Sequence, residues 1–192
     1  MLQSKSIFAI LLALSLLFSE AHGFWWNMKV IGYARVPPGT ASLINADNKV
    51  HIEERPDYDI LGRGFYLGQE PSYSHLGEGE EGFWYCAIKA RDWNMKNINK
   101  VFVPERYWIG GLFKEVNLEA YLKWLTNKKP EKQLRFTFIE RSDTQMQMLI
   151  PISMINNDDL DLWAQCYESE QQLRDSSKHF KDFIKWSSKW FF

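Results

Sequence analysis

Short apolar runs occupy the middle and late parts of the chain, and several of them have the length and composition of β-strands. The first, residues 28–36, is rich in apolar and β-branched residues and ends at a proline pair. Further strands are predicted over residues 83–90, 101–103, 134–139 and 146–152. The 134–139 run alternates between apolar and polar residues, so we expect a strand with one buried face and one exposed face.

Helical patterns are fewer and shorter than the strand patterns. Thr40 is placed to cap a short helix early in the chain. Apolar residues spaced by three and four predict an amphipathic helix over residues 117–127. Residues 158–189 predict two short helices, with a strand over residues 162–167 as the alternative. Strands and helices that do not alternate regularly indicate an α+β fold.

The first 23 residues have the pattern of a secretory signal peptide. A basic start precedes an apolar run over residues 7–18, and Ala21 and Gly23 are the small residues that a signal peptidase reads. The run is too short to span a membrane, and the alternative is a buried N-terminal helix. We therefore expect residues 24–192 to form one secreted, extracellular domain.

Composition narrows the classes of function. The 192 residues carry 23 Lys and Arg against 24 Asp and Glu, a formal net charge of −1. Because the charges nearly balance, there is no basic bias of the kind that accompanies nucleic-acid binding. No second long apolar run follows the signal peptide, so we expect no transmembrane segment.

Cys86 and Cys166 are the two cysteines of the chain. Along an oxidising secretory route we expect them to form a disulfide, which would close a loop of about 80 residues and contribute roughly 4 kcal/mol. Two buried free thiols are the alternative. The four histidines show no ligand spacing, so the sequence predicts no metal site.

The C-terminal residues 177–192 interleave aromatic side chains with lysines. This pattern predicts a helix that docks on the domain with its lysines facing outward. The alternative is an amphipathic surface that contacts a membrane peripherally or binds a partner.

Three stretches in order resemble motifs of the ADP-ribosyltransferase fold. They are Gly32-Tyr-Ala-Arg35 at the end of the first strand, Leu61-Gly-Arg-Gly-Phe-Tyr66, and Gln145-Met-Gln-Met-Leu-Ile-Pro151. Their order and separations are similar to those of secreted toxin-type transferases and of related fungal secreted proteins. The resemblance spans residues 30–151.

This resemblance implies a split two-sheet core with short helices and a cleft that binds NAD. In the family, a basic residue ending the first strand orients NAD, the middle motif places a Ser or Tyr beside the nicotinamide, and a glutamate in the last motif stabilises the cation-like ribosyl transition state. The residues carried over to the catalytic role are Arg35, Tyr66 and Gln147. Those carried over to NAD contact are Gly32, Tyr33, Gly64 and Phe65.

The chain departs from the family pattern at two points. Ala34 stands where the basic residue is usual, and Arg35 follows one position later, on the opposite face unless the strand ends or bulges there. Gln147 replaces the glutamate, and losing one such electrostatic group typically costs about 3–4 kcal/mol of transition-state stabilisation. Glu140 and Asp143, in the preceding turn, are carboxylates that could take its place.

Three functions are consistent with this sequence. The first is an effector-like or toxin-like secreted protein that binds a host or cell-surface protein, with catalysis lost or weakened. The second is an active NAD-dependent ADP-ribosyltransferase or NAD glycohydrolase. The third is a secreted α+β interaction module of unrelated fold. The missing charge at Gln147 ranks the first ahead of the second.

Overall fold

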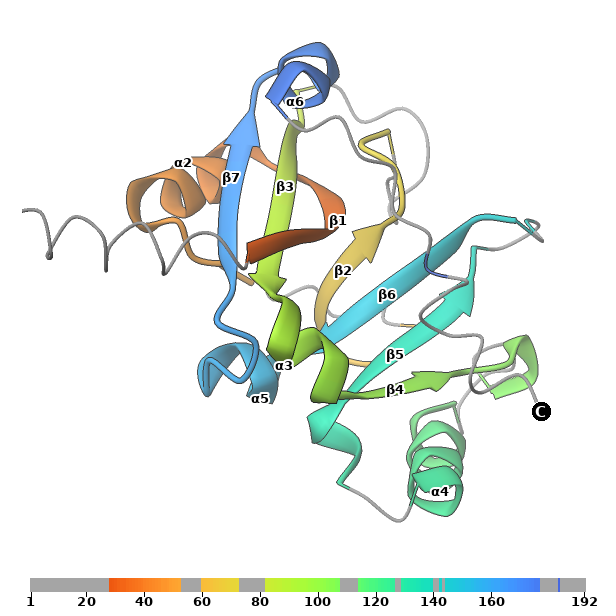
Figure 1. Ribbon diagram of the computed structural model, residues 1–192. Helices are drawn as coiled ribbons and strands as arrows, with labels where there is room; N and C mark the ends of the chain where they lie inside the picture. The colour runs from red at the N-terminus through yellow and green to blue at the C-terminus, as the bar shows by residue number, and fades with distance from the viewer. Residues whose placement is uncertain are drawn as a thin grey trace, which may run out of the picture.

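The computed structural model describes residues 28–52, 60–72, 82–107, 114–126, 129–139, 142, 144–176 and 183. The predicted signal peptide and, apart from Phe183, the predicted C-terminal helix lie outside these residues. Within them the chain forms an α+β fold built on a seven-stranded sheet with short helices around it (Figure 1). The predicted fold class is confirmed at that level.

Six of the seven strands overlap runs for which a strand was predicted, and the one at residues 64–68 was not predicted. The seven strands are β1 (Met28–Val36), β2 (Gly64–Gly68), β3 (Trp84–Arg91), β4 (Asn99–Phe102), β5 (Gln133–Phe138), β6 (Met146–Pro151) and β7 (Trp163–Tyr167). Their order in the sheet is β4-β5-β6-β2-β1-β3-β7. Neighbours are antiparallel except β4 and β5, which are parallel. Residues 163–167 form β7, so the strand that was the alternative prediction for residues 162–167 is confirmed.

Five α-helices and two 3₁₀ turns are described around the sheet. They are α2 (Pro38–Asp47), α3 (Asp92–Asn97), α4 (Lys114–Thr126), α5 (Ile152–Asn156), α6 (Glu170–Ser176), η1 (Glu105–Tyr107) and η3 (Pro130–Lys132). The prediction that Thr40 caps α2 is wrong, because the helix already begins at Pro38, whose fixed φ suits a first helical position. None of the described helices is long and apolar enough to cross a membrane.

The sheet consists of two halves joined by a narrow connection between β1 and β2. One residue pair, Tyr33 with Gly68, links these two strands, whereas eight pairs link β1 to β3. We call β1, β3 and β7 the three-strand half, and β2, β4, β5 and β6 the four-strand half. Figure 1 shows β3 and β7 running at an angle to β5 and β6.

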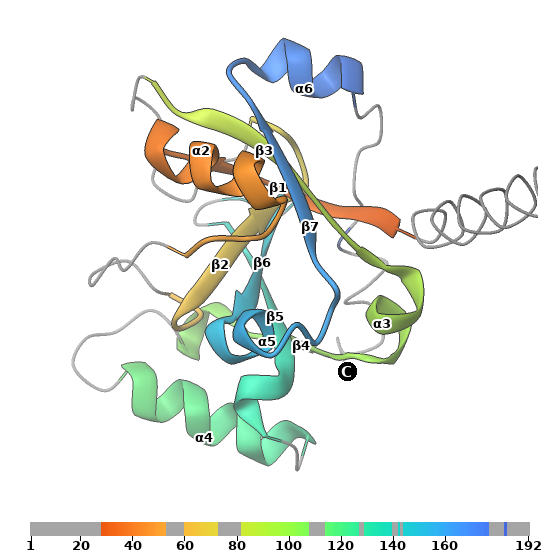
Figure 2. The ribbon, with the colours of Figure 1, turned by 90° about the vertical axis from the view of Figure 1, so that its left-hand side faces the viewer.

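One face of the sheet carries the main hydrophobic core. Both halves contribute to it, with Ala34 and Ile88 from the three-strand half and Phe136 and Met148 from the four-strand half. On the opposite face, which we call the outer face, two smaller apolar clusters lie apart from each other. One contains residues of α4 and the four-strand half, and the other contains Leu173 of α6 and residues of the three-strand half. Figure 2 shows α4 and α6 at opposite ends of the molecule.

The expected disulfide is present and joins neighbouring strands. Cys86 of β3 lies directly opposite Cys166 of β7, and the two are bonded across a sequence separation of 80 residues. Both cysteines are buried on the core face. The bond therefore fixes β7, an edge strand, to the interior of the three-strand half.

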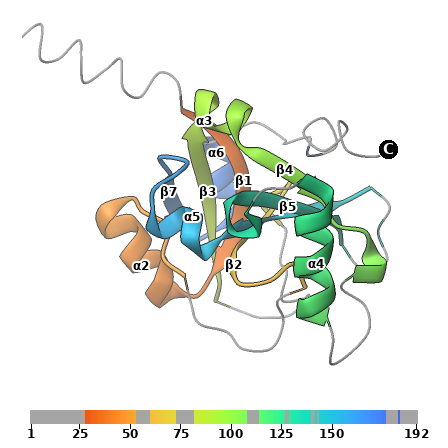
Figure 3. The same cartoon turned by 90° about the horizontal axis from the view of Figure 1, so that it is seen from below.

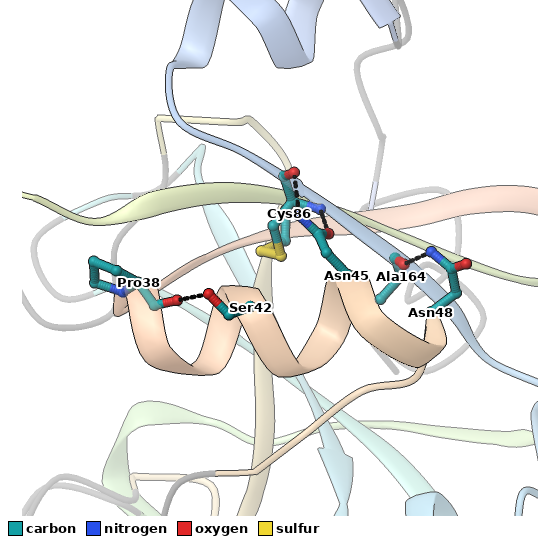
Figure 4. Close-up of a disulfide and its surroundings, with 7 residues drawn as sticks. Pro38, Ser42, Asn45, Asn48, Cys86 and Ala164 are labelled. Atoms are coloured by element: carbon teal, nitrogen blue, oxygen red, sulfur yellow. Dashed lines mark hydrogen bonds between the residues drawn. A yellow bond between two sulfur atoms is a disulfide. The ribbon is translucent and has the colours of Figure 1, made fainter.

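Both edges of the sheet are covered by polar side chains. At β7, Asn45 of α2 accepts a hydrogen bond from the Cys166 amide at 2.8 Å and donates one to its carbonyl at 3.0 Å. The side-chain amide of Asn48 donates to the Ala164 carbonyl at 3.0 Å (Figure 4), and the backbone carbonyl of Asn48 accepts from the Ala164 amide at 2.9 Å. At β4, the Tyr121 hydroxyl donates to the Phe102 carbonyl at 3.0 Å. These contacts occupy backbone groups that an edge strand would otherwise offer to another chain.

Candidate functional site

The narrow connection between the two halves places one row of residues across four adjacent strands. Tyr33 of β1 pairs with Gly68 of β2, Gly68 with Gln147 of β6, and Gln147 with Thr137 of β5. Directly paired residues in a sheet project from the same face. The row therefore lies on the outer face, and Gly68 contributes no side chain at its centre.

Arg35 lies on this outer face, on the same side of β1 as Tyr33. The pairing of β1 with β3 shifts by one residue between Val30 and Gly32. Beyond the shift, Ala34 pairs with Cys86 and is buried in the core, while Arg35 pairs with Tyr85. Arg35 thus shares the face of Tyr33, two residues before it. The sequence analysis allowed for a bulge at Arg35, but the observed bulge precedes the whole Gly32–Arg35 motif, so Ala34 and Arg35 still project from opposite faces of β1.

The guanidinium of Arg35 lies against aromatic rings of its own half. Its Cζ is 5.6 Å from the ring centroid of Phe83 and 5.5 Å from that of Tyr85. Both distances are in the range of cation–π contact. The charge is held toward β3, on the side of β1 away from β2.

Tyr66 faces the same side as Arg35 and Gln147, but its hydroxyl bonds the turn that precedes β2. It accepts a hydrogen bond from the Leu61 amide at 2.9 Å and donates one to the Gly62 carbonyl at 3.0 Å. The ring is buried in the apolar cluster beneath α4. Tyr66 therefore closes the glycine turn of the middle motif.

Gln147 is buried, with 4% of its surface exposed, whereas Gln145 is exposed and precedes β6. Met146 and Met148 fill the core on the other side of the strand, as the sequence predicts. The site-facing group of β6 is thus a buried neutral amide. Glu140 and Asp143 lie outside the described residues.

The four residues carried over to NAD contact divide between the two faces. Tyr33 and Gly64 lie on the outer face with the candidate site. Gly32 and Phe65 lie on the core face, where a Cβ on Gly32 would approach the Leu67 Cβ to 2.9 Å. At Gly64, a Cβ would lie 2.2 Å from the Ile150 carbonyl oxygen, so this glycine allows β2 and β6 to pair closely.

The prediction of an exposed face on β5 is wrong. Gln133, Arg135 and Thr137 alternate with the core residues of this strand, yet all three are buried. The outer face of β5 lies in the interior of the molecule, alongside Gln147. We call Gln133, Arg135, Thr137 and Gln147 the polar strip. Alternation in a sequence identifies two faces of a strand but does not show what covers the second one.

Arg135 is the charged member of the polar strip, and the sequence analysis did not identify it as a site residue. Its guanidinium donates to the Leu61 carbonyl at 2.5 Å and to the Pro130 carbonyl at 3.2 Å. A Cβ on Gly62 would lie 2.5 Å from the Arg135 Nη1, and the φ of Gly62 is +96°. Both the available space and the backbone conformation therefore favour glycine at this position. Burial lowers the pKa of Arg135, an effect that the nearby Tyr66 opposes.

The described residues contain no cluster of three or more His, Cys, Asp or Glu side chains that could hold a metal ion. The polar groups that project from this part of the outer face are two guanidinium groups, two phenols, two amides and a hydroxyl, those of Arg35, Arg135, Tyr33, Tyr66, Gln133, Gln147 and Thr137. Such groups can hydrogen-bond a polar ligand, but none of them carries the negative charge that stabilises a developing cation.

Comparison with known proteins identifies a family whose function is unknown. A family model described as a family of unknown function (DUF5910) matches residues 59–190, which is more than half of the chain. No curated protein matches the chain.

Proposed function

Because the chain belongs to the DUF5910 family, a family of unknown function, we propose its function from its own fold and site. It is a secreted protein with an ADP-ribosyltransferase-like fold that acts by binding a host or cell-surface protein, with NAD chemistry lost or weakened. One observation carries this proposal: Arg35, Tyr66 and Gln147, chosen from three separate motifs, project from the same face of three adjacent strands.

The shape of the sheet supports the same conclusion. The resemblance implies a core split into two sheets, with its site where they diverge. Here the sheet is joined by the single pair Tyr33 and Gly68, and the three motif residues flank that connection. Arg35 projects from the outer face of β1, two residues after Tyr33, with its guanidinium against the rings of Phe83 and Tyr85.

The loss of catalysis follows from the chemistry of the same residues. Gln147 can hydrogen-bond a ribose hydroxyl, but it lacks the negative charge that would stabilise a cation-like ribosyl group. The hydroxyl of Tyr66 is engaged by Leu61 and Gly62. A neutral amide and an engaged hydroxyl therefore do not favour rapid cleavage of a glycosidic bond at this site.

Restoring the carboxylate tests the enzymatic part of the proposal. We expect the wild type to release no nicotinamide from NAD above background, and Gln147→Glu to release it measurably. Gln145→Glu is the matched control, because it adds the same charge at an exposed position two residues away. Arg35→Ala in the Gln147→Glu background should remove the gained activity.

Two outcomes contradict the proposal. Activity in the wild type would favour the active transferase or glycohydrolase instead. No gain in a Gln147→Glu protein that unfolds at the wild-type temperature, together with no binding of NAD to the wild type by ligand-observed NMR, would favour an unrelated interaction module. The NMR measurement uses the wild type, so it gives an answer even if Gln147→Glu does not fold.

The partner is tested on intact cells. Fluorescently labelled wild-type protein should bind host cells, and treating the cells with protease beforehand should abolish the binding. Binding that survives the treatment would overturn the assignment of a protein partner.

A further inference from the structure

Phe183, in the C-terminal stretch 177–192, is fully buried, although aromatic residues and lysines are interleaved around it in the sequence. Its side chain belongs to the main hydrophobic core, on the core face of the sheet. Leu173 of α6, earlier in the chain, lies in the apolar cluster on the outer face. The last part of the chain therefore contributes side chains to both faces of the sheet.

The Phe183 ring lies between strands of the two halves. It packs edge-to-face with Phe136 of β5, with ring centroids 5.7 Å apart and planes at 81°. Gly32 of β1 is close to the same ring, because a Cβ added to Gly32 would lie 3.2 Å from the Phe183 Cζ. In the sheet, β6 and β2 separate β5 from β1. Neighbouring strands are about 4.8 Å apart, so these two rings together bridge the strands on either side of the narrow connection.

Strand pairing contributes little to holding the halves together at this point. Tyr33 and Gly68 are the single residue pair that joins β1 to β2. Gly32 and Leu67, which directly precede these two residues, approach each other on the core face, where a Cβ on Gly32 would lie 2.9 Å from the Leu67 Cβ. The angle between the halves therefore depends on side-chain packing behind the connecting pair, and Phe183 is part of that packing.

We propose that Phe183 is a wedge that fixes the angle between the two halves of the sheet and, through that angle, the width of the candidate site. Arg35 projects from the outer face of one half, and Tyr66 and Gln147 project from that of the other. With the ring removed, the halves can hinge about the single connecting pair, which changes the distance between these groups. The effect on the candidate site rests on the proposed function, whereas the hinge itself does not.

The experiment measures the distance between the halves in the full mature chain. One nitroxide-bearing residue replaces Leu43 of α2, a helix that is bonded to β7 through Asn45, and another replaces Lys123 of α4, which packs on the four-strand half. Both positions are exposed, and Figure 3 shows α2 and α4 on opposite sides of the molecule. The labels are carried by non-natural amino acids, so the disulfide stays intact. Double electron–electron resonance gives the distribution of distances between them.

The wild type should give one narrow distribution of distances. Phe183→Ala should broaden it about twofold or more, because it leaves a cavity between strands of both halves. Met154→Ala is the matched control, because Met154 is equally buried in the same core but lies in α5, directly after β6. Its loss should lower the stability and leave the distance distribution unchanged.

Phe183→Leu keeps an apolar side chain in the core and should give a width between those of the wild type and Phe183→Ala. It also provides the measurement if Phe183→Ala does not fold. The proposal is overturned if the folded Phe183 variants keep the wild-type distribution, or if Met154→Ala broadens the distribution as much as they do.

The distance measurement needs no ligand, so it gives an answer even if the candidate site binds no NAD. The link to the site is tested separately by ligand-observed NMR with NAD. We expect Phe183→Ala to bind NAD about tenfold more weakly than Met154→Ala, because only the first change alters the angle between the halves. Equal affinities of these two variants, with binding by the wild type, would overturn the link between the wedge and the site.

Discussion

The two halves of the sheet are stabilised in different ways. The three-strand half is fixed by the disulfide Cys86–Cys166 and by the Asn45 contacts to its edge, and its outer face carries the small apolar cluster around Leu173. The four-strand half has no described disulfide and buries the polar strip, including the charged Arg135. One half resembles an ordinary stapled scaffold, while the other depends on buried hydrogen bonds.

This difference shows that the four-strand half buries polar groups whose desolvation is not offset by apolar packing alone. A buried polar group is unfavourable unless it is hydrogen-bonded, and a buried charge more so. Among the described residues, five of the six buried polar side chains lie in β5, in β6 or directly after β2. The candidate site lies on this half and at its connection to β1. Polar side chains on a buried strand face are unfavourable for folding, and a binding site is where such residues are expected.

Removing the disulfide should have the largest effect and should test whether the three-strand half is a scaffold. Cys86→Ala with Cys166→Ala should lower the free energy of unfolding by about 4 kcal/mol, because the unfolded chain loses a cross-link over 80 residues. Urea denaturation of the double variant and of the wild type measures this. Wild type treated with reductant should converge on the double variant; an equal midpoint with and without the bond would contradict the scaffold role.

Arg135→Ala should have the next largest effect on the free energy of unfolding, and the destabilised region should be the four-strand half. The change leaves the Leu61 and Pro130 carbonyls without their donor and opens a cavity under Gly62, so we expect a loss of about 3 kcal/mol. Arg174→Ala removes an exposed ion pair within α6 and is the matched control, with an expected loss of about 0.5 kcal/mol or less.

Hydrogen exchange distinguishes the halves in the same experiment. Amides of β2 and β5 should lose protection in Arg135→Ala, while those of β3 and β7 keep it. Equal losses across both halves would show that the sheet unfolds as one unit and that the two halves do not differ in stability.

Much of the fold could be predicted from local pattern. The run at residues 28–36 matches β1 at both ends, because an apolar, β-branched segment stopped by proline has few alternatives. The disulfide was predicted from the secretory pattern and an even number of cysteines. The 134–139 run located β5 correctly, but its second face was wrong, since burial there depends on elements distant in sequence.

The candidate site was predictable only in part, for the same reason. The motifs selected Arg35, Tyr66 and Gln147, which the fold places on one face. Their hydrogen-bond partners could not be read from the sequence, and Arg135 was missed because an arginine on the polar side of an alternating strand usually indicates solvent. The closest local signal was Gly62, whose missing side chain makes room for the guanidinium.

Asn45→Ala should have an intermediate effect and should test how the edge of the three-strand half is protected. It removes two hydrogen bonds to Cys166, so we expect a loss of about 2 kcal/mol. Ser42→Ala, which loses one exposed bond within α2, should change stability very little. Size-exclusion chromatography should show association of Asn45→Ala but not of Ser42→Ala, because an uncovered strand edge can pair with another copy. A monomeric Asn45→Ala of wild-type stability would mean that the disulfide alone secures β7.

Tyr66→Phe has the smallest expected effect on stability. It tests whether the buried polar groups of the four-strand half stabilise the fold or bind a ligand. Removing the hydroxyl leaves the Leu61 amide and the Gly62 carbonyl unpaired, which should cost about 1 kcal/mol and leave the ring packed under α4. Tyr107→Phe, in a half-buried ring at the surface, is the control and should stay within about 0.5 kcal/mol of the wild type. If NAD binding to Tyr66→Phe matches the wild type while stability falls, the tyrosine of the middle motif holds the turn, and the buried polar groups of this half serve the fold first. If stability is unchanged and NAD binding is lost, the hydroxyl leaves the turn to meet the ligand, and the polar contrast between the halves reflects a functional site.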